Sequence, residues 1–378
     1  MSHLLAPATY ADQRDKARRI LPRQLFDYID GGSYNEVTLR NNSQDLDRLC
    51  ISQRVLRDVS RITTSTRILG QDWSMPVALA PVGLAGLFRR RGEIQAAHAA
   101  QAFGIPFTLS MMGLCSIEEV AKNSAKPFWF QLYMMRDRGF VMELVERAEK
   151  VGCSALVVTV DLPYTGVRYR DVRNGLVGGL GLSDNIRVII DRMQKLGWLR
   201  DVVLSGRPLT LGTIAHKLPP AGLFPDFVKF AHSNFDPSVT WKDIEWIRAR
   251  WKGSLIIKGV MDEEDARLAA DVGAQSVVVS NHGGRQLDSV SSSIAALPAI
   301  ATAVGDRVDV LIDGGIRSGL DVIKAVALGA KGCLLGRAWA YPLAANGEAG
   351  VKSMLRTMHS EIRVAMALSG ATSISEIK

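Results

Sequence analysis

The sequence predicts an α/β protein built as a (β/α)8 TIM barrel, with an N-terminal helical cap and a long insertion after the fourth strand. Eight short apolar runs recur from residue 77 onward, each ends in a polar or glycine-rich turn, and most precede a helical pattern. Their starts lie 29, 23, 26, 100, 21, 33 and 23 residues apart, so all intervals but the fourth fit one βα unit. The runs are 77–81, 106–110, 129–133, 155–161, 255–259, 276–280, 309–313 and 332–336.

A doubly wound open sheet is the alternative, but it would more often carry a GxGxxG fingerprint after its first strand, which residues 81–86 (PVGLAG) do not match. Helix signals support the barrel. Ser116 and Glu119 form a capping-box pattern, and residues 262–274 start acidic and reach a glycine. We therefore expect one domain over 1–378, divided into a cap, a barrel, an insertion and C-terminal helices at 1–76, 77–345, 172–235 and 346–378.

Composition narrows the class of protein. With 47% hydrophobic and 22% charged residues over 378 positions, the chain can bury a large core. Its four cysteines are far apart and form no CxxC pair, which argues against a disulfide framework and a metal site and indicates a reducing compartment. The start lacks a signal-peptide pattern and no apolar stretch reaches about 18 residues, so neither secretion nor a membrane span is expected.

The positive charge is concentrated in the insertion. The whole chain carries +8, and residues 172–235 hold eight Lys/Arg against four Asp, which is +4. Nucleic acid, an anionic membrane or an anionic substrate would each suit this charge. No zinc-finger spacing, basic zipper or aromatic RNA-binding signature accompanies it, so we do not expect a nucleic-acid partner.

In an α/β barrel, functional side chains follow the C-terminal ends of the strands. Lys258 ends an apolar run there and needs an anionic partner, either a structural salt bridge or an electron-rich ligand. In the run SNHGGRQLD, His282 can accept a proton and Arg285 can grip a carboxylate. The polar residues at these ends include Ser110, Gln131, Tyr133, Thr159, Asp161, Arg168, Ser280, Asn281 and Asp313.

The last two strand ends predict a phosphate site. DGGIRSGLD follows the seventh run and GRAW the eighth, where barrels commonly bind phosphate through glycine amides and a helix N-terminus. Arg317 and Arg337 lie in these two motifs. We expect a phosphorylated ligand, although glycines that only make tight turns would give the same pattern.

The chain resembles the FMN-dependent L-α-hydroxy acid dehydrogenase and oxidase family over nearly its whole length. The resemblance is carried by YIDGGSYNEVTL, APVGLAG, WFQLYMMRDR, TVDLPYTGVRYRD and IIKGV, and most specifically by SNHGGRQLD together with DGGIRSGLD. Within the family the likeness is greatest to the bacterial respiratory branch that oxidises L-lactate, through LPRQLFDYIDGGSYNE, SNFDPSVTWKDIEWIR and SGATSISEI.

The resemblance implies roles for the residues at the barrel mouth. His282 is expected to be the base, oriented by Asp161, while Tyr133 bonds the substrate oxygen and Lys258 sits at the flavin N1/O2 edge. Arg285, Arg168 and Tyr28 are expected to hold the substrate carboxylate. The residues expected around FMN are Ala80, Pro81, Val82, Ser110, Gln131, Thr159, Lys258, Ser280, Asp313, Gly314, Gly315, Arg317, Gly336 and Arg337. Whether the base takes the α-proton or the hydroxyl proton stays open.

Two regions bear on substrate and location. Met112 stands where glycolate oxidases have a tryptophan, which leaves the substrate wall open to acids larger than glycolate. Residues 184–203 place Ile186, Ile189, Ile190, Met193 and Leu196 on one helical face. That pattern fits either a helix lying in a membrane surface or a helix packed on the barrel, and the resemblance favours the membrane.

The resemblance therefore implies oxidation of an L-2-hydroxy acid, L-lactate to pyruvate first, with FMN as cofactor and the respiratory quinone pool as acceptor. The alternatives are an oxidase that uses O₂ and a dehydrogenase for a bulkier acid such as mandelate. A peripheral homotetramer on the cytoplasmic side of the inner membrane, bound to its anionic surface, is the expected assembly. From another class of protein, a barrel that binds a phosphorylated ligand without turnover would fit part of the pattern.

Overall fold

The eight predicted strands form a closed parallel barrel. A computed structural model describes residues 7–177, 181–218, 230 and 233–377. The strands are hydrogen-bonded in the order β3-β10-β9-β8-β7-β6-β5-β4. The ring closes where Leu79 bridges Phe107, and the Leu79 amide donates to the carbonyl of Pro106 at 2.9 Å. The strands are β3 (Val77–Leu79), β4 (Thr108–Ser110), β5 (Trp129–Tyr133), β6 (Ala155–Thr159), β7 (Ser254–Val260), β8 (Ser276–Val279), β9 (Asp309–Ile312) and β10 (Gly332–Leu335).

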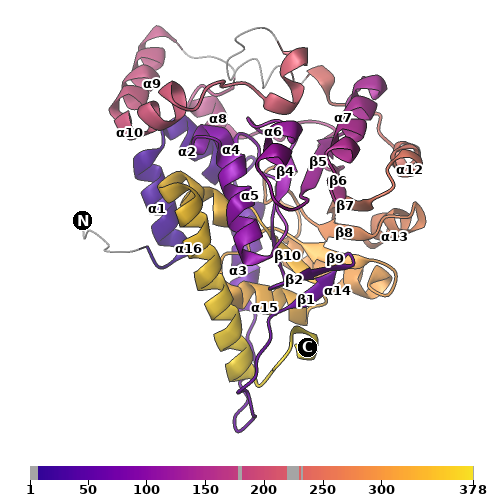
Figure 1. The fold of residues 1–378 in the computed structure, drawn as a ribbon. Coiled ribbons are helices and arrows are strands. Elements are labelled where there is room, and N and C mark those ends of the chain that lie inside the picture. The colour runs from indigo at the N-terminus through magenta and orange to yellow at the C-terminus, as the bar shows by residue number, and fades with distance from the viewer. Residues whose placement is uncertain (1–6, 178–180, 219–229, 231–232, 378) are drawn as a thin grey trace.

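Helices surround the strands on the outside of the barrel (Figure 1). Ser116 caps α6, because its Oγ accepts from the Glu119 amide at 3.1 Å. The predicted capping box is only half formed, since the Glu119 side chain pairs with Arg91 at 3.0 Å. Asp262 caps α13 within the predicted acidic segment. The helices are α4 (Ala85–Phe88), α5 (Gly92–Phe103), α6 (Ile117–Lys122), α7 (Arg138–Lys150), α12 (Trp241–Arg250), α13 (Glu263–Asp271), α14 (Ser293–Val304), α15 (Gly319–Ala327) and α16 (Arg337–Ser369). The last of these is bent at Asn346 and Gly347 and is followed by a 3₁₀ turn, Ile374–Glu376, so the expected C-terminal helices largely continue the eighth barrel helix.

The N-terminal cap contains three helices and a hairpin. The helices are α1 (Tyr10–Ile20), α2 (Arg23–Asp30) and α3 (Val37–Arg48), and the hairpin pairs β1 (Thr66–Ile68) with β2 (Gln71–Trp73). The sequence predicts a helical cap over 1–76, which is correct for the three helices but does not include the hairpin. Its turn, Leu69-Gly70, has positive φ at both residues but lacks the Asn or Asp that usually marks such a turn.

The hairpin closes the N-terminal end of the barrel. Ile68 and Trp73 are buried among inward-facing side chains of the strands, and the Trp73 and Trp129 rings lie 5.6 Å apart. Ala78, Val157, Ile256, Val278, Leu311 and Leu334 belong to the same apolar cluster. Because this end of the barrel is packed, a ligand site belongs at the opposite end, where the strands finish.

The described residues of the insertion after β6 contain several helices and divide into two differently packed parts. The elements described there are α8 (Tyr169–Arg173), α9 (Leu182–Gln194), α10 (Leu196–Trp198), a π-helical turn (Leu199–Leu204) and a 3₁₀ segment (Gly212–Lys217). Figure 1 shows α9 and α10 at the top of the molecule, beside α1 and α2. No helix in the described part of the chain is long and apolar enough to cross a membrane.

The apolar residues of α9 do not pack on the barrel. Ile186, Ile189, Ile190 and Met193, together with Leu196, are between 48% and 73% exposed. By contrast, Trp198, Val202, Leu211 and Ile214 are buried in the main core. The interpretation as a packed helix is therefore wrong for α9 and right for the chain that follows it. The predicted single helix over 184–203 is also interrupted, since α9 ends at Gln194.

Candidate active site

A cavity of about 380 Å³ opens at the C-terminal ends of the barrel strands. Most of the residues predicted for the site line it: Tyr28, Ala80, Pro81, Val82, Tyr133, Thr159, Arg168, Lys258, His282, Arg285, Asp313, Gly314, Gly315, Arg317, Gly336 and Arg337. The other four, Ser110, Gln131, Asp161 and Ser280, are not among its lining residues. Asp161 and Ser280 are hydrogen-bonded to the lining residues His282 and Lys258. Ser110 donates to Gln131 at 3.0 Å, and Gln131 lies two residues before Tyr133 on β5, so the sequence-predicted set lies together in space.

His282 and Asp161 form a partly buried pair at the edge of the cavity. The imidazole Nδ1 lies 2.9 Å from Asp161 Oδ1 and 3.1 Å from Oδ2. Since a carboxylate only accepts, Nδ1 carries the proton and Nε2 of the neutral ring is left as the acceptor. Burial raises the pKa of Asp161, but His282 and Lys258 outweigh it and hold that pKa below its usual value. Asp161 therefore stays ionised beside the ring.

The backbone around this pair adopts conformations that few side chains allow. Gly259, directly after Lys258, has φ of 110°, and a Cβ there would lie 2.7 Å from the side chain of Asp161. His282 itself has φ of 57°, followed by left-handed Gly283 and Gly284. Left-handed conformation at a histidine is a source of local strain that functional sites often retain. It places the imidazole beside Asp161 rather than along the strand direction.

Lys258 is fully enclosed and has the anionic partner that its position demands. Its Nζ lies 2.9 Å from Asp313 Oδ2 and donates to Ser280 Oγ at 2.9 Å. Burial lowers the pKa of Lys258, but Asp313 and Asp161 more than compensate, so this pKa lies above its usual value. Lys258 also lines the cavity. It therefore forms an internal salt bridge and at the same time can face a bound ligand, so both interpretations of its position hold.

Arg285, Arg168 and Tyr28 meet on one wall. The Arg285 Nη1 donates to the backbone carbonyls of Tyr28 at 2.6 Å and Gly31 at 2.8 Å. Its guanidinium lies 4.9 Å from the centroid of the Tyr28 ring, and that of Arg168 lies 5.6 Å from the same centroid. Burial, and then the neighbouring Arg168, lower the pKa of Arg285 to about 10. Two cations held this close favour an anion between them.

Arg168 and Tyr133 complete this wall. Arg168 Nε lies 2.8 Å from Oδ2 of Asp171, a carboxylate that is almost completely buried. Burial, reinforced by Asp161 and Tyr28, raises the pKa of Tyr133 far above its usual value. Tyr133 therefore remains a neutral hydroxyl that can donate a hydrogen bond.

The remaining polar atoms fit a flavin. Gln131 Nε2, Thr159 Oγ1 and Asp313 Oδ1 are buried and have no hydrogen-bond partner among the described residues. Such buried polar groups need a partner, and a flavin offers carbonyl and ring-nitrogen edges and ribityl hydroxyls. At the phosphate end, Gly314 and Gly315 have positive φ beside Arg317 and Arg337. The residues present thus match the donors and acceptors of FMN.

Several lining residues were not identified from the sequence. Phe235, from the far end of the insertion, is buried with its ring centroid 5.0 Å from that of Tyr133. Leu162, Val177 and Asn42 also line the cavity. Asn42, on α3, forms two side-chain hydrogen bonds of 2.8 Å with Asn281. The motif SNFDPSVTW contains Phe235 and offered a signal, but nothing in the sequence places Asn42 beside strand β8.

A cofactor with hydrogen-bonding ring edges and a phosphate fits this cavity, beside groups suited to proton transfer on a carboxylate substrate. That combination is typical of a flavin-dependent oxidoreductase on a (β/α)8 barrel. Residues 17–378 match the sequence profile of the FMN-dependent dehydrogenase family. The chain belongs to this family, and FMN is its cofactor.

Relatives and solved structures agree with this family. An L-lactate dehydrogenase of Caulobacter sp. (strain K31) is 55% identical over 97% of this chain and 96% of its own length. One from Azorhizobium caulinodans is 53% identical with the same coverage. The structure of the monotopic membrane protein (S)-mandelate dehydrogenase has a TM-score of 0.91 at 33% identity, and that of a mandelate oxidase 0.84 at 38%. Each covers 98% of this chain and 97% of its own.

Proposed function

We propose that this enzyme oxidises L-lactate to pyruvate and passes the electrons to a membrane quinone. The observation that carries the proposal is the grouping of the His282–Asp161 pair with the Arg285, Arg168 and Tyr28 wall in one cavity. Such a cavity suits a small acid with an oxidisable hydroxyl next to its carboxylate. The relatives at 53–55% identity, named L-lactate dehydrogenase, support lactate over mandelate as the substrate.

His282 acts as the general base in this proposal. The Asp161 carboxylate holds Nδ1–H and stabilises the imidazolium that forms when Nε2 takes a proton from the substrate. Tyr133, kept neutral by burial, donates to the substrate oxygen. Both modes of oxidation, removal of the α-proton or of the hydroxyl proton, give the imidazole the same role.

The guanidiniums fix the substrate carboxylate. Arg285 and Arg168 approach the Tyr28 ring, and each retains N–H donors beyond those used by its protein partners. With the carboxylate held by the arginines and the hydroxyl by Tyr133, only one enantiomer places its reacting hydrogen in the productive direction. We therefore expect selectivity for the L acid.

FMN, when bound, accepts the two electrons of the oxidation. Lys258 would lie against its N1/O2 edge, and Gln131 and Thr159 would satisfy other ring and ribityl atoms. Arg317 and Arg337, with Gly314 and Gly315, would hold the phosphate. The cation of Lys258 favours negative charge at its position, which assists reduction.

The insertion supports a membrane location for the acceptor. The apolar residues of α9 face solvent, and two of its polar side chains hold the helix to α2: Asp191 accepts from the Arg23 amide at 2.7 Å, and Arg192 donates to Gln24 at 2.5 Å. A helix with this exposed apolar face suits burial of that face in the interfacial layer of a membrane. The monotopic (S)-mandelate dehydrogenase of the same fold supports this reading.

The test is to supply L-lactate to the purified enzyme with a quinone analogue in the absence of oxygen, and separately with oxygen alone. The proposal expects rapid reduction of the quinone analogue and slow oxygen consumption. Oxygen consumption that is as fast as quinone reduction would instead support a hydroxy acid oxidase. Turnover with L-mandelate but not with L-lactate would replace the proposed substrate.

A further inference from the structure

The C-terminal end of α2 supplies both a side chain and a row of backbone acceptors to the cavity. Tyr28 lines the cavity, and its carbonyl and that of Gly31 accept from Arg285. Arg337 binds the same turn, because its Nε donates to the Ile29 carbonyl and its Nη2 to that of Gly31, both at 2.8 Å. The position of this one turn therefore sets the position of a substrate arginine and a phosphate arginine together.

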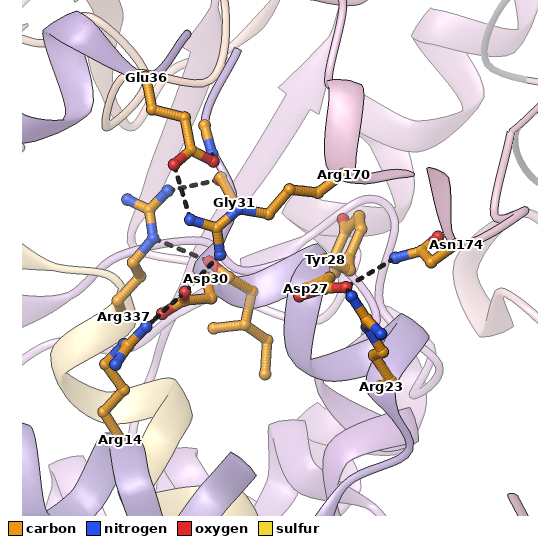
Figure 2. A network of polar contacts seen from close by, with 12 residues as sticks. Arg14, Arg23, Asp27, Tyr28, Asp30, Gly31, Glu36, Arg170, Asn174 and Arg337 are labelled. Atoms are coloured by element: carbon orange, nitrogen blue, oxygen red, sulfur yellow. Dashed lines mark hydrogen bonds and ion pairs between the residues drawn. The ribbon is translucent and has the colours of Figure 1, made fainter. Parts of the chain in front are cut away.

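Asp30 anchors that turn from behind (Figure 2). It is 6% exposed and its two oxygens accept from three side chains. Arg14 of α1 binds both oxygens at 2.5 and 2.8 Å, Tyr341 of α16 donates to Oδ1 at 2.6 Å, and Arg170 of α8 donates to Oδ2 at 2.6 Å. Burial alone would raise the pKa of Asp30, but these hydrogen bonds hold it well below its usual value.

Arg170 joins this anchor to α8, the helix whose N-cap is the substrate-site residue Arg168. Its Nη2 donates to Glu36 Oε2 at 2.6 Å, and Glu36 Oε1 accepts from the Gly32 amide at 3.0 Å, so Arg170 spans the end of α2 (Figure 2). Arg170 belongs to α8, and the residue that caps α8 is Arg168. The Asp30–Arg170 ion pair thus connects the helix that carries Tyr28 to the helix that carries Arg168.

We infer that Asp30 and Arg170 are positioning residues that set the spacing of the substrate-carboxylate site, between Tyr28 on α2 and Arg168 on α8. The inference rests on the proposed function of that site. Neither Asp30 nor Arg170 is among the described residues that line the cavity. Their charged groups are bound to protein partners instead, Asp30 to Arg14, Tyr341 and Arg170, and Arg170 also to Glu36. Their effect must pass through the placement of Tyr28, Arg285 and Arg168, and it should change carboxylate affinity far more than proton transfer by His282.

The test compares Arg170→Met with Arg147→Met in the FMN-loaded enzyme. Arg147 is a matched control, since it is 22% exposed against 32% for Arg170 and bridges Glu118 at 2.7 and 3.0 Å. The Arg147–Glu118 ion pair connects α7 to α6, and no described residue of either helix lines the cavity. Arg170→Met should lose more thermal stability, because its partner Asp30 is 6% exposed and Glu118 is 50% exposed. The positioning effect is therefore judged by KM against kcat, which a general loss of stability does not separate.

We expect Arg170→Met to raise the KM for L-lactate about tenfold, with kcat within about threefold of the parent. The dissociation constant of propionate, a carboxylate without the oxidisable hydroxyl, should rise by a similar factor in a titration followed by flavin absorbance. Arg170→Lys should recover part of the loss, because one ammonium keeps the charge but lacks the planar fork that spans Asp30 and Glu36. Arg147→Met should leave all three constants within about twofold.

Asp30→Asn provides a second route with little change in volume. Asp30→Asn should raise the KM for L-lactate and the dissociation constant of propionate. In the double variant Asp30→Asn/Arg170→Met, both constants should be about those of the more strongly affected single variant, because both substitutions break the same ion pair. Unchanged KM and propionate affinity in either variant would overturn the inference. A parent enzyme that does not oxidise L-lactate would instead contradict the proposed function, while propionate binding would still report on the site.

Discussion

The barrel mouth and helix α9 distribute polar and apolar side chains in opposite ways. At the mouth, Arg285 and Arg168 lie against the same Tyr28 ring. Buried polar atoms of Gln131, Thr159 and Asp313 there have no hydrogen-bond partner among the described residues. On α9, isoleucine and methionine side chains face solvent, while Asp191 and Arg192 bind α2. Each arrangement is unfavourable unless something else is bound there. The mouth requires a polar, anionic ligand, and α9 requires an apolar surface.

The two regions meet at α2. Its N-terminal end contacts α9 through Arg23 and Gln24, and its C-terminal end carries Tyr28 and Asp30. The comparison therefore makes separable predictions: changes at the mouth should affect chemistry without changing membrane binding, and changes on the outer face of α9 should do the reverse.

The largest effect is expected from removal of the base. His282→Gln should retain FMN and keep substrate affinity within about tenfold, because the imidazole acts as the reaction proceeds. Flavin reduction by L-lactate should slow by about 10² or more, the scale of general base catalysis. Anaerobic stopped-flow absorbance measures this rate. A near-normal rate would remove His282 from the mechanism.

The outer face of α9 gives the next largest effect. Replacing Ile186, Ile189 and Met193 by Asp should weaken binding to anionic vesicles by about 10² or more, since three exposed apolar side chains are lost and negative charge is added. Co-sedimentation with vesicles measures it, and flavin reduction should stay within about twofold. Val364→Asp/Leu368→Asp, at comparably exposed positions near the C-terminal end of α16, is the control. A parent enzyme that does not bind vesicles at low salt would contradict the comparison.

A smaller effect is expected when Arg285, which binds the substrate carboxylate, is replaced by another cation. Arg285→Lys loses the planar fork and its contacts with two carbonyls, so the KM for L-lactate should rise about tenfold, with slower flavin reduction. FMN content should be unchanged. Steady-state kinetics with the purified variant provide the measurement, and lactate kinetics equal to those of the parent would show that Arg285 does not hold the carboxylate.

The smallest effect concerns acid stability. Because the pKa of Asp30 is depressed in the folded protein, its contribution is present above the unfolded pKa of about 3.9 and is lost as the pH falls below it. Its arginine partners are about one-third exposed, so the contribution should be about 1 kcal/mol. Asp30→Asn should therefore be less stable than the parent at pH 6, and the gap should narrow below pH 4. Denaturant unfolding at both pH values tests it, and a gap independent of pH would contradict the assignment.

The strands and their ends could be predicted because each buried parallel strand is a continuous apolar run. Once the runs are known, the barrel rule places His282, Lys258 and Asp313 at one mouth. The cap hairpin could not be found in this way, since Leu69-Gly70 is a rare turn sequence. Phe235 was missed because it returns to the cavity only after the whole insertion.

Periodicity identified the apolar face of α9 but not the direction in which it points. That direction depends on contacts with α2, and a pattern of hydrophobicity is the same for a helix turned inward or outward. The Asp30 network has the same limitation, because its members come from α1, α2, α8 and α16 and no local pattern joins them. Pairings between distant segments are set by the fold, so the sequence motifs alone did not reveal them.

The most direct test of the central claim is anaerobic addition of L- and D-2-hydroxy acids to the purified, FMN-loaded enzyme while its flavin absorbance is followed. The account predicts that L-lactate bleaches the flavin rapidly, that D-lactate does not, and that one equivalent of pyruvate forms for each flavin reduced. An oxidised flavin in the presence of every L-2-hydroxy acid, or equal bleaching by both enantiomers, would contradict it.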